Sequence, residues 1–303
     1  MTFKQDIQDI LDQYDIHAGV SAWHIESDEQ VDVNGDTPFP MASTFKIPIL
    51  ATAFTQLAEG KFSLDQRITL NEEDKSPGSG ILPYFGEGLE PTLLDLFTLM
   101  IIISDNTATD MIIDFLGGPQ VIEDYMHQLG LTNIFVKFNC KDIIKGLFPE
   151  SLHGKPKEEI TEWANKNDII RDGITFSLDS DNDVATANDM NKLLHMIYSG
   201  DLFDGDIQQT AIDILFKQQF NVRLSRFLPN GIKVAHKTGT IGGIRNDSGI
   251  IYISDTNHVI LTLFTEWDEA PYWNKPEEHF QRVFEVETAM GKIGRCVFDA
   301  FQS

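Results

Sequence analysis

The sequence has little cysteine and no long apolar run. Its two cysteines, Cys140 and Cys296, form no Cys-x-x-Cys pair, so a disulfide framework is not indicated and two buried free thiols are expected. The longest apolar stretch, around residues 99–103, is far too short to span a membrane. The first residues lack the charged-then-apolar pattern of a signal peptide. We therefore expect no membrane insertion and a cytoplasmic location, with a secreted or periplasmic one as the alternative for a mature form.

Basic residues are also scarce. Lys and Arg number 23 against 47 Asp and Glu, which gives a formal net charge of -24. Nucleic acids and anionic membranes attract clustered basic residues, so neither is an expected partner. The eight histidines show no pairing at i, i+4, so no metal or other cofactor is expected. What remains is a small-molecule substrate, and we expect a monomer.

Hydrophobic periodicity predicts helices at both ends of the chain and through its middle. Helical spacing covers residues 3–14, 47–59, 93–104, 108–115, 121–129 and 187–199, and a last helix carries Val283, Val286, Met290, Ile293 and Val297 on one stripe. Strands are predicted at 20–25, 30–33, 233–240, 249–254 and 259–266, the first two as a hairpin. Residues 140–184 show no sustained period, and we expect a long, partly ordered loop with a short helix near 158–165.

This order of elements predicts an α+β fold. Strands from both termini would form one antiparallel sheet flanked by helices, with an all-helical domain inserted between them. The predicted sheet domain is discontinuous, covering residues 1–38 and 212–303, and the helical domain covers 39–211.

A serine and a lysine stand three positions apart where the first central helix begins. In Phe39–Pro48, Ser43 and Lys46 would share one face of the helix. An amine beside a hydroxyl can act as base for a nucleophile, provided that it loses its own proton. The pair alone indicates little, because about one chance match to Ser-x-x-Lys is expected in such a chain.

Two further motifs change that balance. Ser104-Asp105-Asn106 ends the apolar helix over 93–103, and Lys237-Thr238-Gly239-Thr240 lies on a predicted strand. The joint chance of all three motifs in this order, each on a fitting element, is roughly one in a thousand. Together they favour Ser43 as a nucleophile.

With these motifs the chain resembles the penicillin-recognising serine hydrolases, and within them the class A β-lactamases. The resemblance covers most of the chain and leaves out residues 140–184. It implies the β-lactamase/transpeptidase-like fold and a serine hydrolase that opens the β-lactam amide. Ser43 would attack the carbonyl carbon and form an acyl-enzyme, Lys46 would take the proton, and Ser104 would relay it. Burial and a second cation, Lys237, would keep Lys46 neutral.

The resemblance also implies the groups that bind substrate. Asn106 would bond the substrate's side-chain amide, while Lys237 and Thr238 would hold its carboxylate. Gly239 would leave room for an extended substrate along the strand edge. The backbone N–H groups of Ser43 and Thr240 would form an oxyanion hole.

Beside these groups, Asp105 is expected to be structural, a buried carboxylate that holds the turn of its motif together.

Two features depart from the class A pattern. The Glu-x-x-Leu-Asn stretch that supplies the deacylating base is absent, and Glu150 or Glu162 are the nearest substitutes. Where class A enzymes often place an arginine the chain has Ser248, and the neighbouring Arg245 should lie on the opposite strand face. Two alternatives therefore stay open: a D,D-peptidase or esterase-like relative with the same Ser-Lys-Ser centre, or a penicillin-binding protein that acylates but releases the acyl group slowly.

Overall fold

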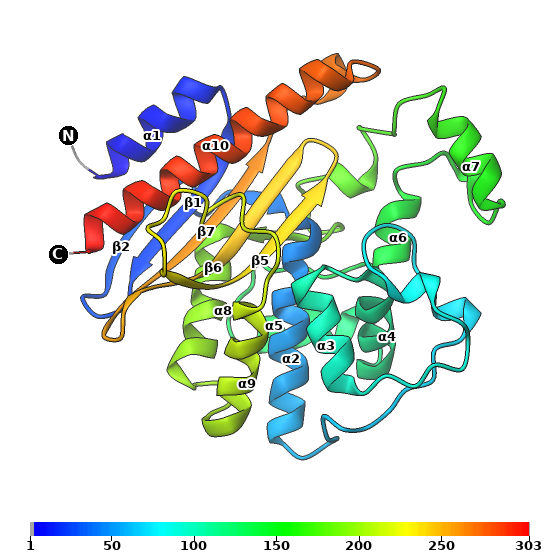
Figure 1. Cartoon of the computed structure of the whole chain (residues 1–303), viewed down its shortest axis with the longest axis horizontal. Coiled ribbons are helices and arrows are strands. Elements are labelled where there is room, and N and C mark those ends of the chain that lie inside the picture. The colour runs from blue at the N-terminus through cyan, green and yellow to red at the C-terminus, as the bar shows by residue number, and fades with distance from the viewer. Residues whose placement is uncertain (1–2, 303) are drawn as a thin grey trace.

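The computed structural model describes residues 3–302. A five-stranded antiparallel sheet in the order β2-β1-β7-β6-β5 forms its centre (Figure 1). The strands are β1 (His17–His24), β2 (Glu29–Val33), β5 (Lys233–Ile241), β6 (Ile244–Ser254) and β7 (Asn257–Glu266). Since β1 pairs with β7, the two ends of the chain share one sheet, and the predicted α+β fold is confirmed.

Helices from the two termini cover one face of this sheet. In Figure 1, α1 (Phe3–Tyr14) and α10 (Pro276–Phe301) lie side by side across it. They bury the apolar stripes predicted for them, Ile7 and Leu11 on α1 and Val286 among others on α10. Each Å² of apolar surface that this burial removes from water stabilises the fold by roughly 25 cal/mol.

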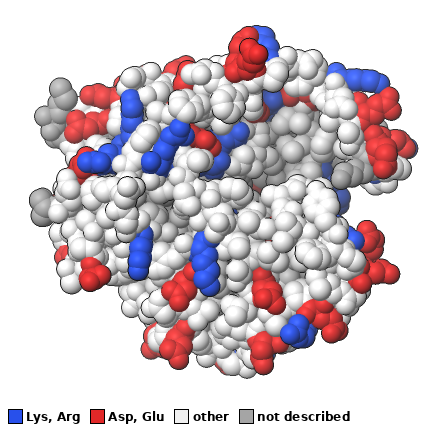
Figure 2. Space-filling view, in the orientation of Figure 1, with Lys and Arg blue, Asp and Glu red and all other residues white. Residues whose placement is uncertain are grey.

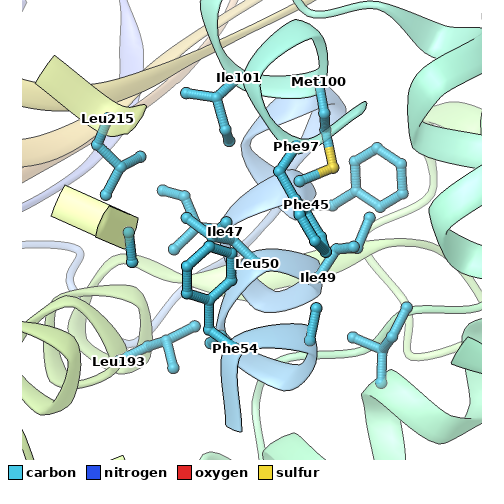
Figure 3. Close-up of a cluster of buried hydrophobic side chains, with 14 of the residues drawn as sticks. Phe45, Ile47, Ile49, Leu50, Phe54, Phe97, Met100, Ile101, Leu193 and Leu215 are labelled. Carbon is cyan, nitrogen blue, oxygen red and sulfur yellow. The ribbon is translucent and has the colours of Figure 1, made fainter. Parts of the chain in front are cut away.

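The opposite face of the sheet packs against the helical region, which is organised around α2 (Lys46–Ala58). Every residue of α2 from Lys46 to Phe54 is buried, as its apolar sequence predicted. Figure 3 shows its side chains packed against α3 (Leu93–Ile102), α8 (Ala187–Ser199) and α9 (Gly205–Phe216). The helices α4 (Asn106–Leu116) and α5 (Pro119–Gln128) complete this layer.

Residues 140–184 are more ordered than predicted. They contain α6 (Cys140–Lys145), α7 (Lys157–Ala164) and the short strand β4 (Val184–Thr186). Strand β4 pairs with β3 (Pro38–Pro40), so the end of this segment is joined to the residues that lead to Ser43. Three-residue strands are too short for a period to show in sequence. In Figure 1, α7 projects from the body of the molecule.

Helix α9 was not predicted, and it bears on the predicted domain division. The predicted boundary between residues 211 and 212 falls inside this helix, so no loop separates the two predicted domains at that point. The division into a sheet domain and a helical domain otherwise stays a prediction. Across residues 3–302, no helix combines the length and apolar character needed to cross a membrane.

Candidate active site

Ser43 lies in a 3₁₀ turn, Ala42–Phe45, directly before α2. The sheet holds the approach to this turn, because the Asn246 side chain donates from Nδ2 to Pro40 O (2.8 Å) and Met41 O (3.0 Å). Ala42 has a φ of 45°, in the left-handed region that a residue with a Cβ rarely adopts. Such strain, about 1–3 kcal/mol, persists only where surrounding contacts fix the backbone. The nucleophile candidate is thus held in a strained, anchored turn.

Lys46 is completely buried and faces the Ser104 motif. Its Nζ donates to Ser104 O (2.9 Å), Ser104 Oγ (3.0 Å) and Asn106 Oδ1 (2.9 Å). An ammonium donates in all three contacts, whereas the neutral amine has two N–H donors and a lone pair that accepts from the Ser104 hydroxyl. Burial disfavours the charged form and lowers the pKa of Lys46. The amine is therefore both positioned and biased toward the neutral form that a base requires.

The turn that carries Ser104 is itself strained, with a φ of 59° at this serine. It is held by Asp105, whose carboxylate accepts the backbone N–H groups of Ile81 (2.6 Å), Leu82 (2.9 Å) and Ala108 (3.0 Å). The structural role predicted for Asp105 is confirmed. The aspartate keeps Ser104 in place. It forms no hydrogen bond with Lys46.

A loop over residues 76–80 closes around the same turn. Ser79 donates from Oγ to Ser104 O (2.6 Å), and Asn106 donates from Nδ2 to Pro77 O (2.8 Å). Gly80 has a φ of 119°, and a Cβ there would lie 2.4 Å from Asp105 Oδ2. Asn106 therefore has its amide oxygen on Lys46 and its amide nitrogen on the loop, and a substrate amide would have to share or replace the second contact.

Lys237 lies on β5, fully buried, with Nζ donating to Thr238 O (2.6 Å). Burial lowers its pKa well below the ordinary value, and the charges of Lys46 and Arg223 lower it further. The two lysines were predicted to be neighbours, and Lys46 does act electrostatically on Lys237. For Lys46 itself, burial lowers the pKa as predicted, while the predicted lowering by the charge of Lys237 is not among the causes.

Gly239 is required for a reason that was not predicted, while its role in leaving room for substrate stays a prediction. A Cβ on Gly239 would lie 2.7 Å from Met41 O and 3.1 Å from Ser43 N. Contacts below about 3 Å force a neighbour to move, and backbone atoms here cannot move cheaply. Gly239 thus lets β5 approach the backbone of the nucleophile itself. This brings Ser43 N beside the strand that carries Thr240, the two residues predicted to supply the oxyanion hole.

Arg223 belongs to this site and was not predicted. Its guanidinium is buried and donates to Gly239 O (2.8 Å), Asn246 O (2.8 Å) and Thr240 Oγ1 (2.6 Å). Glu287 lies 3.3 Å from its Nε. The residue stands in an irregular segment between α9 and β5, where no motif or period marks it.

Arg245 pairs with Thr240 in the sheet register, but its guanidinium is engaged elsewhere. It donates to Gly242 O (2.7 Å) and Ile244 O (2.8 Å), and its guanidinium sits 5.1 Å from the centre of the Trp267 ring. The sheet register pairs Ser248 with Lys237, which confirms that Arg245 occupies the other strand face.

Neither glutamate considered as a deacylating base lies at the site. Glu162 projects from α7 with its side chain 72% exposed and bonded to Lys166 (2.7 Å), and Glu150 is exposed. The segment between α6 and β4 turns both charges toward solvent, and a role of either glutamate as the base stays a prediction that this exposure does not favour.

Cys140 is the first residue of α6. Its backbone N donates to Asp110 Oδ1 (2.7 Å), which ties α6 to α4, and its side chain is buried. Each of the two groups, the Cys140 thiol and the Lys46 amine, affects the pKa of the other, so they lie within electrostatic reach. Burial raises the pKa of Cys140 well above the ordinary value, so the thiol is neutral near neutral pH. Figure 2 shows a hollow on this side of the molecule, between the β5–β6 turn and the arm that carries α7.

Comparison with known proteins places this geometry in a family. A sequence model of the Beta-lactamase enzyme family matches residues 2–301. Beta-lactamase VEB-1 of Pseudomonas aeruginosa is 24% identical over 271 residues, covering 85% of this chain and 80% of VEB-1.

Two solved structures share the architecture closely. A β-lactamase from Sphaerobacter thermophilus is 27% identical with a TM-score of 0.75, and the match covers 98% of this chain and 96% of that one. A point mutant of PBP-A, solved as an acyl-enzyme complex with penicillin G, is 25% identical with a TM-score of 0.77, covering 98% and 95%.

Proposed function

Because the chain belongs to the β-lactamase enzyme family, we propose that it is a serine hydrolase, acylated on Ser43 by β-lactams, that opens the β-lactam amide. The observation that carries the proposal is the buried Lys46 amine with its three hydrogen bonds to Ser104 and Asn106. A lysine at the surface would stay protonated at neutral pH and could not accept the proton of Ser43.

In the acylation step, Ser43 Oγ attacks the lactam carbonyl carbon. The C–O bond forms, the lactam C–N bond breaks, and the hydroxyl proton reaches the leaving nitrogen through Lys46 and Ser104. Ser104 is suited to the relay because its Oγ lies 3.0 Å from Lys46 Nζ. Backbone N–H groups of Ser43 and Thr240 would stabilise the oxyanion, and one such donor contributes about 3–4 kcal/mol.

The substrate carboxylate would bind at the edge of β5. Lys237, Thr238 and Thr240 supply cationic and hydroxyl groups there, and Arg223 adds a guanidinium that donates to Thr240 Oγ1. Arg223 is buried, so its charge is less screened than at the surface. A bound carboxylate would favour the charged form of Lys237, whose pKa burial lowers. This pocket would serve β-lactams and D-alanyl peptides alike, since both carry a carboxylate.

A second candidate function is favoured by one observation. At the start of α6, within electrostatic reach of Lys46, stands the neutral thiol of Cys140, and both Glu150 and Glu162 are exposed. A neutral thiol does not activate water as a carboxylate would. The alternative is a penicillin-binding protein whose acyl group on Ser43 is released slowly.

One experiment separates the two functions. The protein is mixed with a penicillin or a chromogenic cephalosporin, and its intact mass is followed against time, with Ser43→Ala as control. Rapid turnover with a transient adduct supports the β-lactamase, and a persistent adduct supports the slow-releasing protein. An unmodified wild-type mass without turnover contradicts both.

The molecular state of the protein is also part of the proposal. We expect it to act as a monomer in the cytoplasm, or outside it if secreted, on a small-molecule substrate and without a cofactor. Sedimentation equilibrium and cell fractionation test the first two statements, and activity that survives a chelator tests the third.

A further inference from the structure

A buried histidine on β5 and a buried aspartate on β6 form a pair that takes no part in the proposed reaction. His236 on β5 and Asp247 on β6 are both fully buried, with Nδ1 2.8 Å from Asp247 Oδ1. The other ring nitrogen, Nε2, lies 3.1 Å from Asn221 Oδ1. Buried polar groups are costly unless paired, so a pair kept at this place needs a structural or functional reason.

The same pair has a second contact with the segment that contains Asn221. Asp247 uses its other oxygen, Oδ2, to accept the backbone N–H of Leu224 at 3.2 Å. Asn221 and Leu224 stand on either side of Arg223. The pair therefore fastens the segment at two points, one before the arginine and one after it.

Between these points, Arg223 reaches the edge of β5. One guanidinium nitrogen donates to Gly239 O and Asn246 O, and the other donates to Thr240 Oγ1 at 2.6 Å. Since Thr240 Oγ1 accepts from Arg223, the threonine's own hydroxyl hydrogen is directed to another acceptor. Thr240 is exposed, so that acceptor is water or a bound carboxylate.

We propose that His236 and Asp247 are positioning residues: through Asn221 and Leu224 they hold Arg223 against Thr240, and so set the affinity of the site for a substrate carboxylate. This rests on the proposed function, in which a carboxylate binds at the edge of β5. Neither residue touches substrate. A purely structural pair would support the fold without distinguishing a substrate that has the carboxylate from one that lacks it.

The test uses Asn221, because this residue is exposed and its truncation leaves the buried pair in place. Asn221→Ala removes both the oxygen near His236 and the Nδ2 contact with Gln218 O (3.2 Å), whereas the matched variant Asn221→Asp loses only the second contact and keeps an oxygen near His236. Acylation is measured with a penicillin and with its carboxyl methyl ester, over a range of concentrations. We expect Asn221→Ala to raise the half-saturating concentration of the penicillin about tenfold and to leave the maximal acylation rate unchanged. The ester should be unaffected, and Asn221→Asp should restore the penicillin value.

A double variant tests whether the effect passes through Arg223. In an Arg223→Ala background, Asn221→Ala should add nothing further. Equal loss for penicillin and ester, an additive effect in the double variant, or no change in the single variant each overturn the proposal.

A readout without substrate keeps this proposal separate from the proposed function. The guanidinium N–H protons of Arg223 should exchange slowly with water in the wild type and faster in Asn221→Ala, as measured by NMR. Unchanged exchange overturns the positioning role even where acylation occurs. If exchange accelerates while the wild type forms no adduct, the proposed function fails and the positioning of Arg223 stands.

Discussion

The two sides of the Lys46 ammonium are built differently. Toward α3 and α4, its three donors meet Ser104 and Asn106, and the loop over residues 76–80 holds those acceptors in turn. Toward α6, the groups that act on it electrostatically include the neutral thiol of Cys140 and the carboxylate of Asp110, which is already bonded to Cys140 N, Lys141 N and Ser76 Oγ. The glutamates of the arm that carries α7 point into solvent. The groups for attack by Ser43 are assembled, while no comparable set for release of the acyl group stands opposite them in residues 3–302.

The difference follows from what each side must satisfy. A buried amine requires acceptors, so the elements around it are packed closely and tied to one another. The carboxylates of α7 have no buried cation to meet, and they remain solvated at little cost. We therefore expect acylation and deacylation to depend on different segments of this chain. Substitutions in each segment can test the two steps separately.

The largest effect should come from removing the amine. Lys46→Ala takes away the base, and we expect acylation to slow toward the upper end of the roughly 10²–10⁴-fold range for general base catalysis. Lys46→Arg keeps the charge but cannot give up its proton, so it should be slow as well. Stopped-flow acylation rates measure both. Near wild-type acylation in the arginine variant contradicts a base role for Lys46.

The second substitution places a carboxylate at the start of α6. In Cys140→Glu, a carboxylate beside Lys46 should stay ionised and activate water, so we expect deacylation to accelerate about 10²-fold. Decay of the adduct mass after removal of free penicillin measures this rate. Cys140→Gln is the matched control and should leave the rate unchanged.

Two outcomes would contradict this difference between the two sides of Lys46. Equal acceleration in the glutamine variant would show that volume at position 140, and not the carboxylate, matters. Slower release in Glu162→Gln would show that the arm supplies a base after all.

A smaller effect is expected where β5 touches the nucleophile. In Gly239→Ala the added methyl would lie 2.7 Å from Met41 O, so the strand or the turn with Ser43 must shift. Displacements of this kind cost roughly tenfold to a hundredfold in rate. The acylation rate, with a crystal structure of the variant, checks this. Unchanged rates with β5 in place would show that Ser43 tolerates the shift.

The smallest effect concerns Asp183, which joins the two sides. Its backbone O accepts Met41 N (2.8 Å) near Ser43, and its Oδ1 accepts the N–H groups of Lys137 (2.6 Å) and Phe138 (3.0 Å) ahead of Cys140. Its Oδ2 is buried and has no partner among the described residues. Burial raises its pKa to about 7, the charge of Glu123 adds to this, and the charge of Lys137 opposes it.

A raised pKa in the folded state means that the folded protein binds this proton more tightly than the unfolded chain does. The contribution to stability is complete below the ordinary pKa of 3.8 and is lost as pH rises toward about 7. We expect the wild type to lose about 3 kcal/mol relative to Asp183→Asn between about pH 5 and pH 8. Urea unfolding of both proteins at each pH measures the difference. Parallel losses would show that Asp183 is ionised throughout.

Much of the fold was predictable because its signals are local. The buried run of α2, the stripes of α1 and α10 and the first hairpin follow from periods of 3.6 and 2. Two of the three motifs also supplied Lys46, Ser104 and Asn106, which hydrogen bonds join in the structure. Helix α9 and the strands β3 and β4 were missed, because their place depends on packing partners that a local pattern does not contain.

The sequence alone determined the chemistry that this protein can offer: a serine, an amine and a hydroxyl on three elements, and no Glu-x-x-Leu-Asn stretch. Only the tertiary structure decided how these groups act. It buried Lys46 among three acceptors, brought β5 against the Ser43 backbone through Gly239, and delivered Arg223 from an irregular segment to Thr240. The reason is physical, since pKa values and close approaches depend on what surrounds a group in space and not on its neighbours in sequence.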